Sequence, residues 1–219
     1  MKGSVLSTRK LTRGQRELLL NAGIGLTEKD FISIVPLEFS EEDLPKNLIF
    51  TSQNSVAIFD EQFKTEKPLD RNIFCVGEKT AALLSEKGYT VRESADYGAE
   101  LARMIVDRHK EEEFMFFCGR KRNPDLPETL LQNNISFREK HIYDTVFTPT
   151  KIDRIFEGVL FFSPSGVKSY CSENELSEST AFCIGTTTAA EAEKYTSKIV
   201  LATKPTIENV IVQVIRHFS

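Results

Sequence analysis

The sequence predicts an α/β protein with two domains built on parallel sheets. Its 219 residues are enough for two domains of roughly 100 residues, each large enough to bury a core. Short apolar runs alternate with segments of helical periodicity, which is typical of parallel strands connected by helices. The second half of the chain also repeats, in the same order, motifs of the first half, which indicates an internal duplication.

Each apolar run is the length of a strand, and most are followed by a segment with apolar residues on one helical face. The expected strands are residues 5–8, 32–37, 48–51, 72–76, 90–92, 114–118, 135–146, 159–162, 181–184 and 199–202. The expected helices are residues 15–22, 55–62, 79–87, 99–109, 126–132 and 207–218, with further helices after the strands at 159–162 and 181–184.

The duplication is visible in two pairs of segments. NLIFTSQNSV at residues 47–56 matches GVLFFSPSGV 111 positions later, and FCVGEKTAA at residues 74–82 matches FCIGTTTAA 108 positions later. Weaker matches in the same order join Arg9-Lys10 to Arg120-Lys121, Leu19-Leu20 to Leu130-Leu131 and Ile34 to Ile142. Several matches in the same order favour a full-length duplication over chance repetition of one strand.

Two polar linkers, at residues 41–46 and 148–151, suggest where the chain passes between domains. If it crosses at both, the domains interleave: residues 1–38 with 150–219 form one, and residues 39–149 form the other. Each would then hold five parallel strands in a flavodoxin-like order. The two crossing segments would form a two-stranded hinge, with the active-site cleft between the domains. A sequential division into two halves remains the alternative.

Composition excludes several classes of protein. The net charge of −4 disfavours a general nucleic-acid binder, although a small anionic ligand needs only local donors. No uncharged apolar stretch approaches 18 residues, so no membrane span is expected, and no signal-peptide pattern follows the N-terminus, so we expect a cytoplasmic protein. The four cysteines contain no C-x-x-C pair and are expected to be reduced thiols.

The chain has neither a P-loop nor a G-x-G-x-x-G fingerprint. His109, His141 and His217 lack ligand spacing or nearby partners in the sequence, so no metal site is expected. A weak likeness of residues 163–166 to a nucleophile elbow lacks the G-x-S-x-G pattern.

Small polar residues follow several of the expected strands, at residues 51–54, 77–80, 119–122, 163–166 and 185–188. Such residues cap helix N-termini, and free backbone N–H groups at the same positions bind carboxylates or phosphates. Because ligands of open parallel sheets bind at the carboxyl ends of the strands, these loops are the candidate binding site. Tyr143, just before the second linker, is either a half-buried packing residue or a proton donor.

Taken together, TSQNSV, FCVGEKTAALL, YDTV, VLFFSPSGV, FCIGTTTAAEA and the C-terminal KPTIENVI resemble the uroporphyrinogen-III synthase family over residues 5–215. The resemblance implies a cofactor-free hydro-lyase of haem biosynthesis. Such an enzyme removes the hydroxyl group of the linear tetrapyrrole hydroxymethylbilane, inverts ring D and closes the macrocycle. The chemistry would be mainly positioning, with modest acid assistance.

The resemblance also implies roles for residues of this chain. Tyr143 matches the tyrosine expected to assist departure of the hydroxyl group. The substrate-binding residues it implies are Thr51, Ser52, Thr80, Ser163, Ser165, Thr187 and Thr188. Asn54, also a candidate for substrate binding, stands where many members of the family carry a basic residue. The contact with a substrate carboxylate expected of that basic residue could come from Lys79, Arg120 or Lys121, and we expect it from Arg120.

The implied partner is a polyanionic tetrapyrrole, bound by a monomer that makes at most transient contact with the upstream hydroxymethylbilane synthase. Two alternatives share the same polar loops. A two-domain solute-binding or sensor protein would have no catalytic activity. A sugar-phosphate isomerase would need a carboxylate or histidine base in a strand-end loop, where Glu78 is the acidic candidate.

Overall fold

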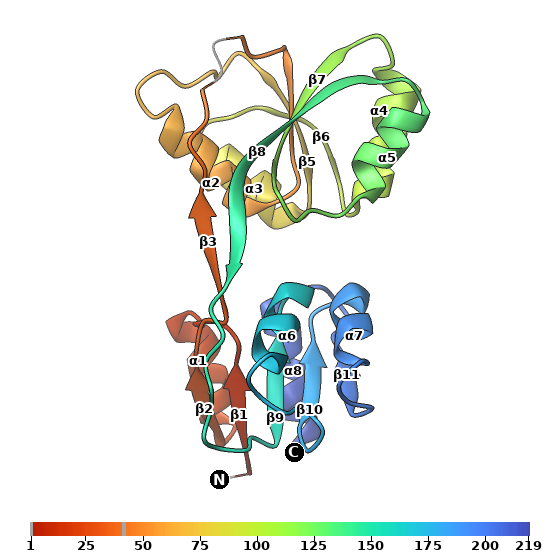
Figure 1. The fold of residues 1–219 in the computed structure, drawn as a ribbon. Coiled ribbons are helices and arrows are strands. Elements are labelled where there is room, and N and C mark those ends of the chain that lie inside the picture. Colours follow the sequence, from red (N-terminus) through yellow and green to blue (C-terminus); the bar gives the residue numbers. More distant parts are fainter. Residues whose placement is uncertain (1, 41–42) are drawn as a thin grey trace. The chain divides into compact units, whose positions relative to one another are not determined.

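The computed structural model describes residues 2–40 and 43–219, and the chain divides into two compact units (Figure 1). Unit 1 comprises Met1–Ser33 and Val146–Ser219, and unit 2 comprises Ile34–Thr145. The predicted boundaries, after residues 38 and 149, lie a few residues further along the chain. Glu41 and Glu42 of the first predicted linker lie outside the described residues. No helix in the described part of the chain is long and apolar enough to span a membrane.

Unit 1 contains a five-stranded parallel sheet with the strand order β11-β10-β9-β1-β2. Its strands are β1 (Gly3–Ser7), β2 (Ile24–Glu28), β9 (Gly158–Phe161), β10 (Thr180–Cys183) and β11 (Ile199–Leu201). Its helices are α1 (Arg13–Asn21), α6 (Pro164–Cys171), α7 (Thr186–Ala192) and α8 (Ile207–His217). Numbered within the unit, the strand order is 2-1-3-4-5, the predicted flavodoxin-like order.

Unit 2 contains a six-stranded sheet with the order β3-β8-β7-β4-β5-β6. Its strands are β3 (Ile32–Pro36), β4 (Asn47–Phe50), β5 (Asn72–Val76), β6 (Val91–Ala95), β7 (Glu113–Gly119) and β8 (Ser136–Phe147). Its helices are α2 (Gln53–Gln62), α3 (Glu78–Glu86), α4 (Gly98–Arg108) and α5 (Asp125–Gln132). The five strands β4 to β8 are parallel, whereas the arrow of β3 runs opposite to that of β8 in Figure 1.

The sequence-based strand assignment was wrong at one point. The strand that pairs with β1 is β2, at residues 24–28, which the sequence did not predict because Gly23 and Gly25 read as a loop. The expected strand at 32–37 is β3, and it pairs instead with β8 in the other sheet. Leu37 donates its backbone N–H to Ile142 at 2.9 Å next to this pair. Unit 2 therefore has six strands rather than the five predicted. When its parallel strands β4 to β8 are numbered 1 to 5, their order in the sheet is 3-2-1-4-5, which differs from the predicted flavodoxin-like order 2-1-3-4-5.

Both sheets are covered by helices on two faces, because alternate residues of each strand point to opposite sides. In unit 2, Phe50 contributes to a core beneath α2 and α3, whereas its neighbour Ile49 contributes to a core beneath α4 and α5. In unit 1, Phe161 and Leu160 separate in the same way, the first toward α6 and α7 and the second toward α1 and α8. The strands are buried on both faces and are therefore continuously apolar in sequence.

The register of the two sheets shows the duplication. Asn47 of β4 pairs with Phe114 of β7 and with Asn72 of β5. Its counterpart 111 residues later, Gly158 of β9, pairs with Val5 of β1 and Thr180 of β10. The strand β4 therefore lies between β7 and β5 in the same way as β9 lies between β1 and β10. The two sheets are equivalent in their five parallel strands, although the first of these strands along the chain is β4 in unit 2 and β1 in unit 1.

Candidate functional site

A pocket of about 350 Å³ lies at the carboxyl ends of the parallel strands of unit 2. All of its lining residues belong to this unit. They are Thr51 and Ser52 after β4, Val76 of β5, Asp96, Tyr97 and Gly98 after β6, Phe116, Gly119, Lys121, Arg122 and Asn123 in and after β7, Leu126 of α5, and Tyr143 of β8. This is the edge of an open parallel sheet at which ligands bind.

Ser52 connects β4 to α2 and is the N-cap of that helix. Its extended backbone (φ −151°, ψ 139°) lets the side chain accept a hydrogen bond from the backbone N–H of Asn54 at 3.1 Å. The backbone carbonyl of Ser52 accepts from the hydroxyl group of Ser55 at 2.7 Å. These bonds fix the loop, so Thr51 and Ser52 are held at the pocket by the same interactions that start the helix.

Tyr143 is 8 % exposed and lies opposite Gly119 on the neighbouring strand, where the register between β7 and β8 shifts. A Cβ atom at position 119 would lie 2.5 Å from Cε2 and 2.6 Å from Cζ of the tyrosine ring. The ring therefore packs directly on the glycine backbone. Burial raises the pKa of Tyr143, and hydrogen bonds with the Ser52 side chain and the Gly119 backbone partly offset the rise. The phenol is thus kept protonated at neutral pH, as a hydrogen-bond donor requires.

The charged residues of the pocket come from the loops after β6 and β7. Lys121 donates from Nζ to the backbone carbonyl of Thr145 at 3.2 Å. Arg122 makes two hydrogen bonds, of 2.7 and 2.8 Å, with the carboxylate of Glu139. Asp96 is exposed at the same pocket.

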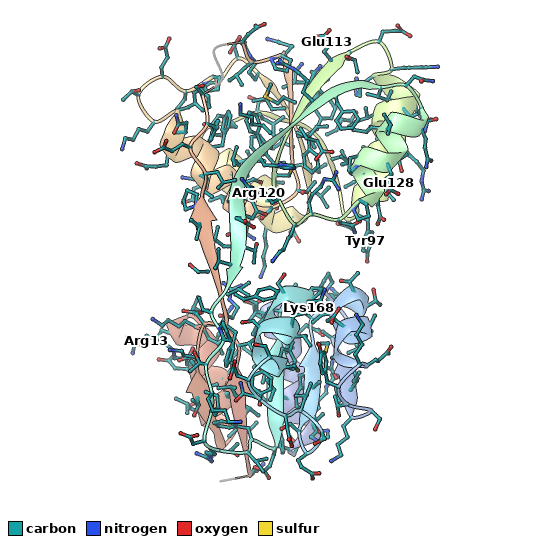
Figure 2. The ribbon with its side chains drawn as sticks, in the orientation of Figure 1. Arg13, Tyr97, Glu113, Arg120, Glu128 and Lys168 are labelled. Atoms are coloured by element: carbon teal, nitrogen blue, oxygen red, sulfur yellow. The ribbon has the colours of Figure 1, made fainter. Side chains whose placement is uncertain are left out.

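Tyr97 is the most exposed aromatic residue that lines the pocket, at 66 %. Figure 2 labels its side chain at the end of unit 2 where the parallel strands have their carboxyl ends. It is the N-cap of α4 and makes no side-chain capping hydrogen bond. Asp96, Tyr97 and Asn123 were not predicted. The expected strand at residues 90–92 ends before β6 does, so Asp96 and Tyr97 did not stand directly after a strand, and Asn123 lies one residue beyond the expected loop at residues 119–122.

Three predicted site residues of unit 2 are not among those that line the pocket. Asn54 is exposed in the first turn of α2, and Thr80 is 5 % exposed within α3. Arg120 is exposed, and its backbone N–H donates to the carbonyl of Tyr143 at 3.0 Å (its side chain is labelled in Figure 2). The lining cations are instead the next two residues, Lys121 and Arg122.

The predicted residues of unit 1 lie at the carboxyl ends of β9 and β10. Ser163 is the N-cap of α6 and accepts from the backbone N–H of Gly166 at 3.1 Å, with Pro164 in the first turn. Ser165 is half-buried in that turn. After Gly185, Thr187 is exposed and Thr188 is 2 % exposed, both at the start of α7. These positions correspond, through the duplication, to those of unit 2.

Comparison with known proteins identifies the family. The sequence model of one family, described as uroporphyrinogen-III synthase HemD, matches residues 16–211, which is most of the chain. The chain belongs to the uroporphyrinogen-III synthase family. This confirms the family predicted from the motifs.

Individual relatives agree with the family match. The porphyrin biosynthesis protein HemD of Ruminiclostridium josui is 27 % identical over 223 aligned positions, which cover 89 % of this chain and 44 % of that protein. The chain thus spans less than half the length of this relative.

Solved structures share the fold. A uroporphyrinogen-III synthetase from Helicobacter pylori 26695 has a TM-score of 0.76 at 18 % identity, covering 98 % of this chain and 99 % of that one. A mutant uroporphyrinogen III synthase from Thermus thermophilus has a TM-score of 0.65 at 15 % identity, covering 99 % and 98 %. They confirm the predicted α/β fold class for this member of the family.

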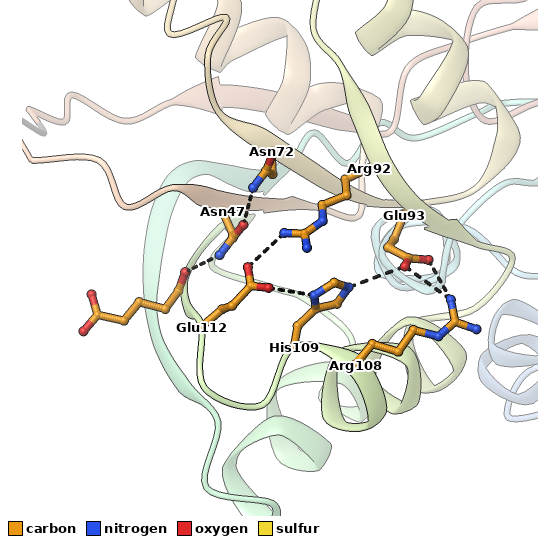
Figure 3. Close-up of polar contacts among 8 residues, drawn as sticks. Asn47, Asn72, Arg92, Glu93, Arg108, His109 and Glu112 are labelled. Carbon is orange, nitrogen blue, oxygen red and sulfur yellow. Dashed lines mark hydrogen bonds and ion pairs between the residues drawn. The ribbon is translucent and has the colours of Figure 1, made fainter.

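A second polar cluster lies at the opposite, amino-terminal edge of the sheet of unit 2 (Figure 3). His109, 6 % exposed, contacts Glu112 at 2.8 Å and Glu93 at 3.4 Å, and its ring packs edge-on against Phe74. The expectation that the histidines lack partners is therefore wrong for His109, which Glu93 reaches from β6, and for His141, whose Nε2 lies 3.5 Å from Oε2 of Glu139. The contacts join the end of α4 to β6 and to the loop before β7, and they favour a structural role for this cluster.

Proposed function

We propose that this chain converts hydroxymethylbilane to uroporphyrinogen III, with loss of water and inversion of ring D. The observation that carries the proposal is the pocket of unit 2, which brings Tyr143 together with Thr51 and Ser52. The family motifs had associated these residues although they are about 90 positions apart in the sequence.

The substrate that this family implies carries an acetate and a propionate on every pyrrole ring, and it needs anion-binding groups rather than a strongly basic protein. The loop at Ser52 and the loop at Ser163 each combine a hydroxyl group with backbone N–H groups at the start of a helix. Lys121 and Arg122 add positive charge at the pocket. We propose that Thr51, Ser52, Ser163, Ser165, Thr187 and Thr188 contact substrate carboxylates, with Lys121 and Arg122 taking the role first expected of Arg120 and Asn54.

The reaction requires little of the protein beyond positioning. The substrate hydroxyl group leaves as water after gaining a proton, and the electron-rich pyrrole stabilises the cation that remains. The substituted carbon of ring D then attacks, rearrangement inverts that ring, and loss of a proton restores the neutral tetrapyrrole, so that the net change is loss of one water. Tyr143 would donate a hydrogen bond to the departing oxygen. Its raised pKa supports donation of this hydrogen bond rather than a standing negative charge.

The test is Tyr143→Phe assayed with freshly prepared hydroxymethylbilane. Acid assistance is worth roughly 10²–10⁴-fold, so turnover should fall substantially without disappearing, because the pyrrole supplies part of the driving force. Tyr170→Phe is the matched control: it removes a phenolic hydroxyl from a residue 3 % exposed in the core of unit 1. Unchanged turnover in Tyr143→Phe at saturating substrate would remove Tyr143 from the mechanism.

The product also distinguishes an enzyme from a binding protein. Spontaneous closure of the substrate gives the type I isomer, so rapid formation of the type III isomer requires catalysis. We further propose that the protein acts as a cytoplasmic monomer and receives substrate through transient contact with hydroxymethylbilane synthase. Sedimentation of the chain alone would test the monomeric state, which a stable oligomer would contradict. Sedimentation of the chain mixed with that enzyme would test the contact, which a failure to associate during turnover would contradict.

A further inference from the structure

Three side chains with metal-binding atoms converge on one face of the β7–β8 pair. Cys118 pairs with His141 across the two strands, and Glu139 lies two residues before His141 and points to the same face. The ligand atoms of the three residues all lie within 4.8 Å of one another. Cys118 is 2 % exposed, whereas the side chain of His141 is 47 % exposed, so the group is open to solvent on one side.

The distances fit a tetrahedral ion. Oε2 of Glu139 lies 3.8 Å from Sγ of Cys118 and 3.5 Å from Nε2 of His141. A tetrahedral zinc ion, with Zn–S of about 2.3 Å and Zn–N or Zn–O of about 2.05 Å, separates sulfur from oxygen by about 3.6 Å and nitrogen from oxygen by about 3.4 Å. These two distances lie within about 0.2 Å of the tetrahedral values, and the third, between Sγ and the imidazole, is no longer than 4.8 Å.

We propose that Cys118, Glu139 and His141 form a binding site for a thiophilic divalent cation of the zinc and cadmium class. Binding replaces the thiol proton by the metal, so that one proton is released to solvent and a sulfur–metal bond forms. Three protein ligands leave the fourth position to water, as at open zinc sites. A thiolate, an imidazole and one carboxylate favour zinc or cadmium over magnesium or calcium, which prefer oxygen ligands alone.

Arg122 competes with the cation for Glu139. Its guanidinium holds both carboxylate oxygens, through Nε at 2.8 Å and Nη2 at 2.7 Å. A cation must displace at least one of these hydrogen bonds, so the site fills at elevated cation concentration rather than permanently.

The same arginine connects the cation site to the pocket. Arg122 lines the pocket, and Gly119, on which Tyr143 packs, follows Cys118 directly. A cation that takes the carboxylate frees the guanidinium for an anion in the pocket, so occupancy of the two positions is linked.

The experiment is titration of the purified chain with Cd²⁺, followed by thiolate-to-metal charge-transfer absorption in the ultraviolet and by proton release in weak buffer. We expect one cation and about one proton per chain. Cys118→Ser should abolish the absorption band, and His141→Ala should weaken binding at least about tenfold. Cys171→Ser is the matched control, because this partly exposed cysteine lies on α6 in unit 1, and its titration should match that of the unchanged chain.

Arg122→Gln tests the competition separately and should strengthen binding severalfold, because it removes the competing guanidinium. The readouts do not depend on catalysis, so they stand apart from the proposed activity. Because His141 is half-exposed, His141→Ala should fold even if Cys118→Ser does not. Absence of the band in the unchanged chain, or a band that survives both ligand substitutions, would overturn the site. Unchanged affinity in Arg122→Gln would overturn the competition.

Discussion

A single methyl group at position 119 is expected to displace Tyr143. The Cβ of Gly119→Ala would stand 2.5 Å from Cε2, 2.6 Å from Cζ and 3.0 Å from the hydroxyl oxygen of the tyrosine. Favourable carbon–carbon contacts lie near 3.5–4.0 Å, so the ring must move by about 1 Å or more. The backbone of Gly119 does not adopt the left-handed conformation, so alanine adds a steric effect without backbone strain.

Two consequences are expected and can be measured separately. Overpacking of this kind costs about 1–3 kcal/mol of unfolding free energy, which urea denaturation will show. A displacement of about 1 Å at a reacting group can lower turnover about 10²-fold, which the initial rate of type III isomer formation will show. Gly14→Ala is the control, because nothing lies within 4 Å of the added atom and it sits in α1.

A double-mutant cycle decides whether the loss of activity acts through the tyrosine hydroxyl group. If it does, Gly119→Ala should reduce turnover far less in a Tyr143→Phe background than in the unchanged enzyme, because the affected group is already missing. Fully additive losses, or near-normal turnover in Gly119→Ala with a measurable loss of stability, would refute the proposed role of the contact.

Three further predictions concern other residues. Asp60→Asn should lower the unfolding free energy at pH 7 by roughly 1–3 kcal/mol, because the carboxylate binds two lysine side chains at 2.6 and 2.7 Å. Burial alone would raise the pKa of Asp60, but these lysines lower it below 3.8. The stabilisation is thus present above about pH 4 and is lost as the pH falls through the folded-state pKa, so a deficit in urea unfolding that does not shrink on acidification below pH 4 would contradict this. Ser52→Ala and Ser163→Ala should each weaken substrate binding by only about 0.5–1.5 kcal/mol, and complete inactivity of either folded variant would show that a side chain dominates recognition. Gly158→Ala would place Cβ 2.6 Å from the ring of Phe182 and should destabilise the chain by about 1–3 kcal/mol, so an unchanged urea midpoint would exclude tight packing there.

The sequence predicted the fold class because buried parallel strands are apolar on both faces and therefore stand out against amphipathic helices. It missed β2, whose partly exposed pattern and flanking glycine resemble a loop, and which forms a strand only because β1 supplies hydrogen-bond partners along its whole length. The low strand propensity of residues 24–28 is thus outweighed by their pairing with β1.

The candidate site was predictable where a residue follows an obvious strand. Thr51 and Ser52 follow β4 and line the pocket, and the family motif marked Tyr143. The contact of Gly119 with the tyrosine ring, like the approach of Cys118 to His141, depends on the register of β7 against β8. The register shifts between Cys118 and Gly119, and no pattern in the sequence of either strand predicts such a shift. Only the structure could therefore show these two contacts.

The discontinuity of unit 1 has a consequence for synthesis of the protein. Residues 34–145 form a continuous segment that carries all but the outer ends of the six strands of the unit 2 sheet. The β1–β2 pair is made earlier but must wait for β9, more than 120 residues later, before its inner edge is covered. An uncovered parallel edge invites mispairing, and contacts of such long sequence separation form slowly. Chains truncated after residue 157 should therefore carry a protease-resistant unit 2 and a protease-sensitive N-terminal segment, so chaperone dependence should be concentrated in that segment.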